Sequence, residues 1–475
     1  MDRKRLITSI VTYGGGDFLV LAVGGLLLLP LYTRHLDPAA YGVFVVTKTN
    51  SDIFNYLLQF GLISAVSRVY FIYRAKQQEA EYLGSILIFQ FLLAAVVFAL
   101  FWLAGGPVWR LLSPGVPAQP FMWFAFALAF FAFVPALFTI LLRLEERAGY
   151  FVAIQAGSAL LLTLLVVLLL VVFKAGVIGL LYGVVLTSLV TWLVVLVLLL
   201  PRLRWRFQWE HVAVSLKFGI PVVVGYFAFF FINKFSIVFL QRHVDLAQVG
   251  FFGLAQQLAL VITLVSLAFG KTFQPIIYSA PADGVAEIVS RLGRIYFPCM
   301  LLGTTVVLSF ASEALSIVAP RSYGHSYYLF LILAASNLIY SFSMLSDSVL
   351  LYCHRPNLSL SISLLGGLVS VLSNVWLVPS LRIYGAVLSV LLTSSVVAMA
   401  TFLVARKMMA FRIEASLWWY VLGSAAVVAF SVFLNGRLGM VPGLLVKFLL
   451  VGLLVTPIVR RLRPVASGAA ASSTG

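Results

Sequence analysis

The chain has 475 residues, of which 62% are hydrophobic and only 10% are charged, and its formal net charge is +17. Soluble domains carry roughly 25% charged residues, so this composition excludes an ordinary water-soluble protein. In a soluble chain the positive charge would favour a nucleic-acid partner. We expect no such partner, because the basic residues cluster between apolar segments.

The chain begins with Arg3, Lys4 and Arg5 and continues into a long apolar run without a small-x-small cleavage site, which favours an uncleaved first span over a signal peptide. Further runs of about 20 apolar residues, the length that crosses a bilayer, recur along the chain. The predicted spans are 7–32, 41–66, 83–104, 120–142, 150–173, 177–200, 216–240, 248–270, 295–318, 327–352, 358–378, 383–405, 416–435 and 440–459.

The lysines and arginines indicate how these spans are oriented. With the N-terminus inside, 22 of the 32 basic residues lie in or near the cytoplasmic connections and seven in the outer ones, and Lys48, Lys234 and Lys447 fall inside spans. This asymmetry follows the positive-inside rule. We therefore predict a multi-pass protein of the cytoplasmic (inner) membrane of a bacterium, with both termini cytoplasmic.

An internal repeat divides the predicted spans. Residues 31–44 (LYTRHLDPAAYGVF) recur as residues 239–252 (FLQRHVDLAQVGFF) at an offset of 208, and Gly179 with Thr187-Ser188 recurs at an offset of 206. The offset covers six spans, so the two halves have the same orientation, as in transporters built from parallel repeats. The Asp in each Arg-His-x-Asp loop is suited to capping the next helix, and we favour a structural turn there.

The predicted fold is therefore all-α and integral to the membrane, with about 14 transmembrane helices. Two pseudo-symmetric six-helix lobes would occupy residues 1–205 and 206–412. Two additional transmembrane helices would occupy 413–463, and the Ala/Ser/Gly-rich tail 464–475 is predicted to be disordered.

The second span carries the main functional signal. Lys48, Asp52, Asn55 and Gln59 are spaced at i, i+4, i+7 and i+11 and so form one stripe along a helix. Because charged groups are costly in lipid, such a stripe is expected to face a bundle interior or a water-filled cavity. Alternatively, Lys48 and Asp52 neutralise each other as an i,i+4 pair without any ligand.

Further polar residues lie in spans 1, 7 and 8. The candidates for the cavity are Asn233, Lys234, Gln256 and Lys271, and Asp17 and Asp52 are candidates for proton coupling. Lys234 could instead snorkel to the outer interface, and Lys271 could anchor the inner end of its helix. No spacing indicates a metal, a cofactor or a catalytic site, and we expect a transporter rather than an enzyme.

Residues 29–44 (LPLYTRHLDPAAYGVF) and 60–70 (FGLISAVSRVY) resemble the multidrug/oligosaccharidyl-lipid/polysaccharide (MOP) exporter superfamily, and within it the polysaccharide-biosynthesis (Wzx-type) flippases. The resemblance implies two MATE-like six-helix lobes around a central cavity that opens alternately inward and outward. It also implies a role for cationic residues in spans 1, 2, 7 and 8, although span 1 offers Asp17 in place of a basic residue.

The implied function is to flip an anionic lipid-linked oligosaccharide, undecaprenyl-pyrophosphate-linked by resemblance, across the membrane for surface polysaccharide biosynthesis. Its partners would be this lipid-linked glycan, membrane lipids, and a polysaccharide polymerase with its chain-length machinery. A MATE-type drug or cation exporter is an alternative, disfavoured by the lysines. A membrane glycosyltransferase or polysaccharide polymerase is another, disfavoured by the short outer loops.

Overall fold

The structure is a computed structural model that describes residues 23–281, 284–409, 417–434 and 443–453. These residues form helices joined by short turns, and no β-strand occurs among them. The helices are η1 (Val23–Leu27), α2 (Leu29–His35), α3 (Pro38–Gln59), α4 (Leu62–Ala75), α5 (Glu79–Leu112), α6 (Phe121–Leu144), α7 (Ala148–Val166), η2 (Val167–Val172), α8 (Gly176–Leu199), η3 (Leu200–Arg202), α9 (Trp209–Asn233), α10 (Phe235–Leu240), α11 (Leu246–Tyr278), α12 (Val285–Ser309), α13 (Ala311–Val318), η4 (Arg321–Tyr323), α14 (Ser326–Ser341), α15 (Ser343–Tyr352), α16 (Pro356–Leu381), α17 (Ile383–Met408), α18 (Leu417–Leu434) and a last helix at Gly443–Leu453.

The predicted membrane spans are matched by these helices. Within the described residues, eleven helical segments between Pro38 and Met408 are long and apolar enough to cross a membrane, and they coincide with predicted spans 2 to 12. Shorter helices fall in the other three predicted spans, namely η1 with α2 in the first, α18 in the thirteenth, and Gly443–Leu453 in the fourteenth. The all-helical, multi-span prediction is thereby confirmed. The tail 464–475 lies outside the described residues.

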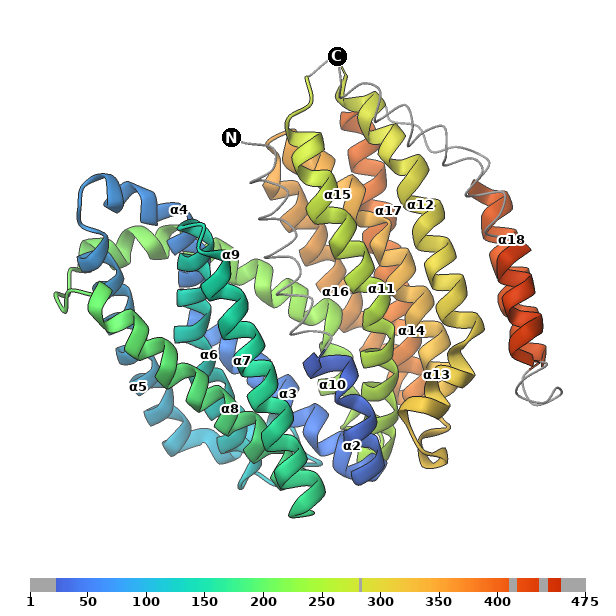
Figure 1. The fold of residues 1–475 in the computed structure, drawn as a ribbon, viewed down its shortest axis with the longest axis horizontal. Helices are drawn as coiled ribbons and strands as arrows, with labels where there is room; N and C mark the ends of the chain where they lie inside the picture. Colours follow the sequence, from blue (N-terminus) through green and yellow to red (C-terminus); the bar gives the residue numbers. More distant parts are fainter. Residues whose placement is uncertain (1–22, 282–283, 410–416, 435–442, 454–475) are drawn as a thin grey trace. The chain divides into compact units, whose positions relative to one another are not determined.

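The helices pack into two compact units (Figure 1). The first contains the described residues up to Gly253 together with Gly366–Ser389, and the second contains Leu254–Leu365 and the described residues from Val390 onward. Thus α11, α16 and α17 each contribute to both units. These bounds differ from those of the lobes at 1–205 and 206–412, which were inferred from the repeat and stay a prediction.

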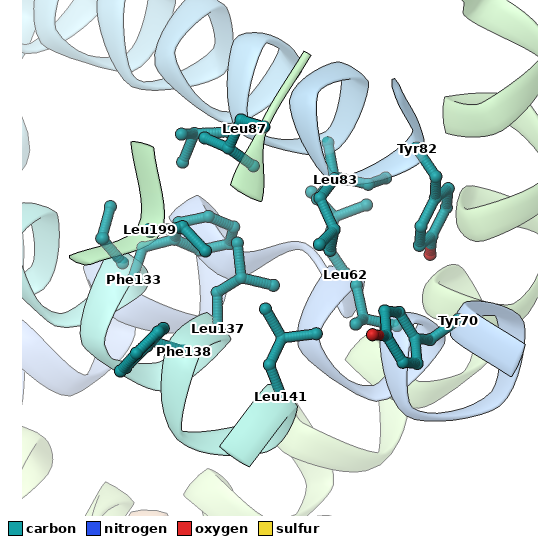
Figure 2. Close-up of a cluster of buried hydrophobic side chains, with 14 of the residues drawn as sticks. Leu62, Tyr70, Tyr82, Leu83, Leu87, Phe133, Leu137, Phe138, Leu141 and Leu199 are labelled. Carbon is teal, nitrogen blue, oxygen red and sulfur yellow. The ribbon is translucent and has the colours of Figure 1, made fainter. Parts of the chain in front are cut away.

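The first unit is built around a core between α4, α5, α6 and α8. Leu62 and Tyr70 of α4, Leu83 of α5, and Leu137 and Leu141 of α6 belong to this cluster and converge as Figure 2 shows. The side chains of Leu62 and Leu137 are fully buried. Burial of one such leucine contributes roughly 1.5–3 kcal/mol, so this cluster contributes strongly to holding α4, α5, α6 and α8 together.

The second predicted span is longer than expected and is interrupted. It extends from Pro38 to Ala75 as α3 and α4, and the break falls at Phe60 and Gly61, both with left-handed backbone dihedrals. Gly61 approaches the backbone of Gly219 on α9 so closely that a Cβ at position 61 would collide with it. The break therefore lets α9 pack directly against the chain at this point.

The seventh predicted span is also interrupted. α9 ends at Asn233, Lys234 leaves the helical conformation, and α10 resumes at Phe235. Next to the break, the carbonyl of Phe231 accepts a hydrogen bond of 2.7 Å from the hydroxyl of Ser370 on α16. Broken helices of this kind survive at membrane depth because neighbouring side chains satisfy the freed backbone groups.

The two copies of the repeated motif form matching turns in the first unit. The Asp37 carboxylate accepts a hydrogen bond of 2.7 Å from the Ala40 amide, and the Asp245 carboxylate accepts one of 2.8 Å from the Gln248 amide. The helix-capping role predicted for these aspartates is confirmed.

The repeated glycines bring the same two helices together. A Cβ on Gly42 would collide with the Leu246 carbonyl, and a Cβ on Gly250 would collide with the Pro38 carbonyl. Gly42 and Gly250 are related by the offset of 208, and so are Pro38 and Leu246. Each glycine therefore contacts the counterpart of the residue that the other glycine contacts. The start of α3 and the start of α11 thus cross about a local pseudo-twofold axis.

Candidate functional site

The polar stripe of the second span lies on α3 and is internally paired. Lys48 Nζ is 3.7 Å from Asp52 Oδ1, and the Gln59 amide donates a hydrogen bond of 2.8 Å to Asn55 Oδ1. The side chains of Lys48 and Asp52 remain 50% and 29% exposed. The pair is therefore open to a ligand rather than sealed in a dry contact.

Lys234 adds a second positive charge to this pair. It lies at the interruption between α9 and α10 and is half-buried. It is close enough to Asp52 and Lys48 to interact electrostatically with both. The three residues form a group with two positive charges and one negative charge, which we call the lysine cluster. The sequence placed these residues in spans 2 and 7, and the structure brings them together within the first unit.

Aromatic side chains connect the two helices that carry the lysine cluster. The ring of Tyr56, one turn beyond Asp52 on α3, stacks on Tyr226 of α9 with 5.5 Å between centroids and meets Phe230 edge-on at 6.4 Å. The Tyr226 hydroxyl is 2.6 Å from the Ser64 hydroxyl of α4. These tyrosines could not be identified from the sequence, because aromatic residues in an apolar span carry no periodic signal of their own.

The remaining predicted site residues occupy several positions. Asn233 donates a hydrogen bond of 2.9 Å to the Phe229 carbonyl of its own helix. Gln256 and Lys271 lie on the part of α11 that belongs to the second unit, where Gln256 is half-buried and Lys271 is exposed. Asp17 falls outside the described residues.

Two more contacts of charged side chains occur in the first unit. The Glu145 carboxylate receives a hydrogen bond of 2.9 Å from Arg202, and Arg68 lies over the Phe218 ring at 4.5 Å. Both arginines come from the connections that the positive-inside rule assigned to the cytoplasm. Both contacts join neighbouring parts of the first unit to each other and lie apart from the lysine cluster, so we leave them out of the candidate site.

The fold is that of the MOP transporters. It is similar to the lipid II flippase MurJ in an inward closed conformation (TM-score 0.73, 10% identity, 96% of this chain and 98% of that chain covered). It is also similar to an inward-facing multidrug resistance MATE family transporter of the MOP superfamily (TM-score 0.65, 17% identity, 84% and 94% covered). A MOP superfamily transporter from Pyrococcus furiosus, described as having a binding pocket of reverse polarity that suggests a different function, matches as well (TM-score 0.56, 18% identity, 86% and 96% covered).

The family follows from the sequence itself. The model of the family described as polysaccharide biosynthesis protein matches residues 19–279, slightly more than half of the chain. The chain belongs to this family, and the resemblance found in residues 29–44 and 60–70 is confirmed. No curated protein sequence matches the chain.

Proposed function

We propose that this protein is a flippase that moves an anionic lipid-linked oligosaccharide, with an undecaprenyl pyrophosphate carrier, from the cytoplasmic to the outer leaflet of the bacterial inner membrane. The observation that carries the proposal is the lysine cluster of Lys48, Asp52 and Lys234, which is net positive. Its residues fall in the predicted second and seventh spans, and Lys234 lies at the interruption between α9 and α10. Family membership and the likeness to a lipid II flippase support it.

The chemistry of the cluster suits a phosphate-bearing head group. A lysine ammonium is a compact charge with three donors that can bind phosphate oxygens. In the resting state Asp52 compensates part of the positive charge, so the lysines are not left unpaired in a medium where isolated charges are costly. An arriving pyrophosphate would displace Asp52 as the partner of Lys48 and would also attract Lys234.

The mechanism would be alternating access between two six-helix lobes, with the sugars in the aqueous lumen and the lipid tail in the bilayer. Both termini would face the cytoplasm, and the product would pass to a polysaccharide polymerase and its chain-length machinery. Asn55, Gln59, Asn233 and Gln256 would supply hydrogen bonds to the cargo, and Lys271 a further positive charge. Asp17 and Asp52 stay predictions as proton-coupling groups.

The MATE-type exporter is the second candidate because MATE transporters share the fold. The net charge of the lysine cluster discriminates between a flippase and a cation exporter, since a drug cation is repelled by a cluster with a net positive charge. The Pyrococcus furiosus transporter, described by its reverse pocket polarity, is a precedent for pocket charge as a guide to function in this superfamily. A glycosyltransferase or polymerase receives no comparable support, since both families of relatives transport rather than catalyse.

The test is a flipping assay with purified protein in proteoliposomes. The probe is a fluorescent polyprenyl-pyrophosphate disaccharide whose inner-leaflet fraction is protected from a membrane-impermeant reductant. We expect Lys48→Ala and Lys234→Ala each to slow flipping about tenfold or more, because a hydrogen bond to a charged group is worth roughly 1.5–3 kcal/mol.

The matched control is Lys217→Ala, an exposed lysine near the other end of α9, which should flip the probe at the wild-type rate. If Lys48→Ala and Lys234→Ala also match the wild type at equal protein content, the lysine cluster is not the head-group site. If the protein exports cationic dyes and leaves the probe in place, the exporter alternative is correct.

A further inference from the structure

Three carboxylates of the described residues lie inside predicted spans, and two of them have a cationic partner. Asp52 pairs with Lys48 at 3.7 Å, and Glu313 Oε1 is 2.7 Å from the Nζ of the buried Lys447. Asp347 on α15 forms no ion pair with any lysine or arginine of the described residues. Among the three described acids in predicted spans, it is therefore the one whose negative charge is left without a compensating cation.

Asp347 lines a cavity of about 180 Å³ inside the second unit. Water occupies roughly 30 Å³ per molecule in the liquid, so this cavity has room for several waters. No basic side chain lines it among the described residues. Its polar lining consists mainly of hydroxyl and amide groups, including those of Asn337, Tyr340, Ser343, Ser359, Ser363 and Thr401.

The hydrogen bond of Asp347 joins two helices. The Ser359 hydroxyl on α16 donates to Asp347 Oδ1 at 2.5 Å, a distance typical of a hydroxyl bound to an ionised carboxylate. Tyr340 of α14 and Tyr278 of α11 lie close enough for their phenols to interact electrostatically with Asp347. Hydroxyl groups can stabilise either the charged or the neutral form of a carboxyl group, so the site can exchange between the two.

A proton fits this site better than a metal ion. A metal cation requires several oxygen ligands that converge on one point, and Asp347 is the one carboxylate that the described residues contribute to the cavity lining. A proton needs one carboxylate oxygen and removes the uncompensated charge completely. Buried aspartates that exchange protons with water in this way form the proton relays of pumps and transporters.

We propose that Asp347 is a proton-binding group of this protein and that its cavity is a place where a proton from water is taken up and released in each transport cycle. The first part, proton binding, stands by itself, and the second part rests on the proposed flippase function. Uptake forms an O–H bond on the Asp347 carboxylate at the expense of a hydronium ion, and release returns the proton to water.

Protonation changes the link between α15 and α16. The charge-assisted bond from Ser359 becomes a bond between two neutral groups, which is roughly half as strong. Protonated Asp347 can also donate a hydrogen bond, for which the cavity offers several oxygens. The proton would thus loosen one helix pair of the second unit, a change suited to biasing the unit between two conformations.

Infrared difference spectroscopy on the purified protein tests the proton site without any transport substrate. A pH jump should change the carbonyl stretch of a protonated carboxyl group in the wild type, and Asp347→Asn should abolish that band. Glu287→Gln, which removes an exposed carboxylate near the start of α12, should leave the band in place. Asp347→Glu should restore a shifted band, which separates loss of the site from misfolding.

The result that overturns the proposal is a band that persists in folded Asp347→Asn. Binding of radioactive sodium that is lost in Asp347→Asn would also overturn it, because the site would then hold a metal ion. Folding of each variant is checked by its elution as a single monodisperse species in detergent.

The coupling role is tested in proteoliposomes with the same fluorescent polyprenyl-pyrophosphate probe. We expect an imposed pH gradient to accelerate flipping several-fold in the wild type and to have no effect in Asp347→Asn. Flipping of the probe without a gradient should persist in this variant. A gradient effect that survives in Asp347→Asn contradicts the coupling role. If the wild type does not flip the probe at all, the flippase proposal fails while the infrared result still decides the proton site.

Discussion

Lys48 and Asp52 are paired in a way that favours exchange of partners over stability. Their charged atoms are 3.7 Å apart and the lysine side chain is half exposed. Exposed pairs of this kind contribute only about 0–1 kcal/mol to folding. The pair is thus a weak internal contact that a stronger anion can replace, which is what a head-group site requires.

Asp52→Asn tests this interpretation. Removal of the negative charge should leave thermal stability nearly unchanged and should strengthen binding of inorganic pyrophosphate about fivefold, since one charge interaction near water is worth ~1 kcal/mol. Isothermal titration in detergent gives the affinity and a thermal melt gives the stability. A loss of pyrophosphate affinity, or a large fall in melting temperature, would mean that Asp52 serves the fold.

The contact between the start of α3 and the start of α11 depends on glycine at two positions. Gly42 and Gly250 each allow the backbone of the other helix to reach van der Waals distance, and the opposing atoms are rigid backbone carbonyls. Small residues at such crossings are the usual device for close helix contact in membranes. The repeat therefore preserves these glycines for a steric reason.

Gly42→Ala and Gly250→Ala should each destabilise the protein by about 1–3 kcal/mol, the usual cost of overpacking. Gly149→Ala on α7 is the control, because a Cβ there meets no atom within 4 Å. Melting temperatures in detergent provide the comparison. If Gly42→Ala has the same melting temperature as Gly149→Ala, the two helices cross less closely than described.

At the level of the whole molecule, the sequence predicted the spans well because bilayer thickness imposes one length on every helix. It did not predict the interruptions at Phe60–Gly61 and at Lys234. Hydropathy averages over about 20 residues, and a local break changes that average little. The glycine that permits the first break could be noticed in the sequence, but its close contact with Gly219 could not.

The candidate site was predicted in part. Helical spacing alone identified the stripe from Lys48 to Gln59, since the i,i+4 relation needs only local geometry. The proximity of Lys234 to that stripe depends on how α9 packs on α3, which periodicity does not encode. Nothing in the sequence pattern distinguishes Asp347 from Glu313, since both fall in apolar spans, and only the lack of a cationic partner for Asp347 in the described structure separates the two.

The central claim is that the charge of the head group decides what this protein carries. The direct measurement compares flipping of the fluorescent polyprenyl-pyrophosphate disaccharide with flipping of the same glycolipid lacking phosphate, by the wild-type protein in identical proteoliposomes. We predict rapid flipping of the anionic probe and flipping of the neutral probe no faster than in protein-free vesicles. Equal rates for the two probes would contradict the account.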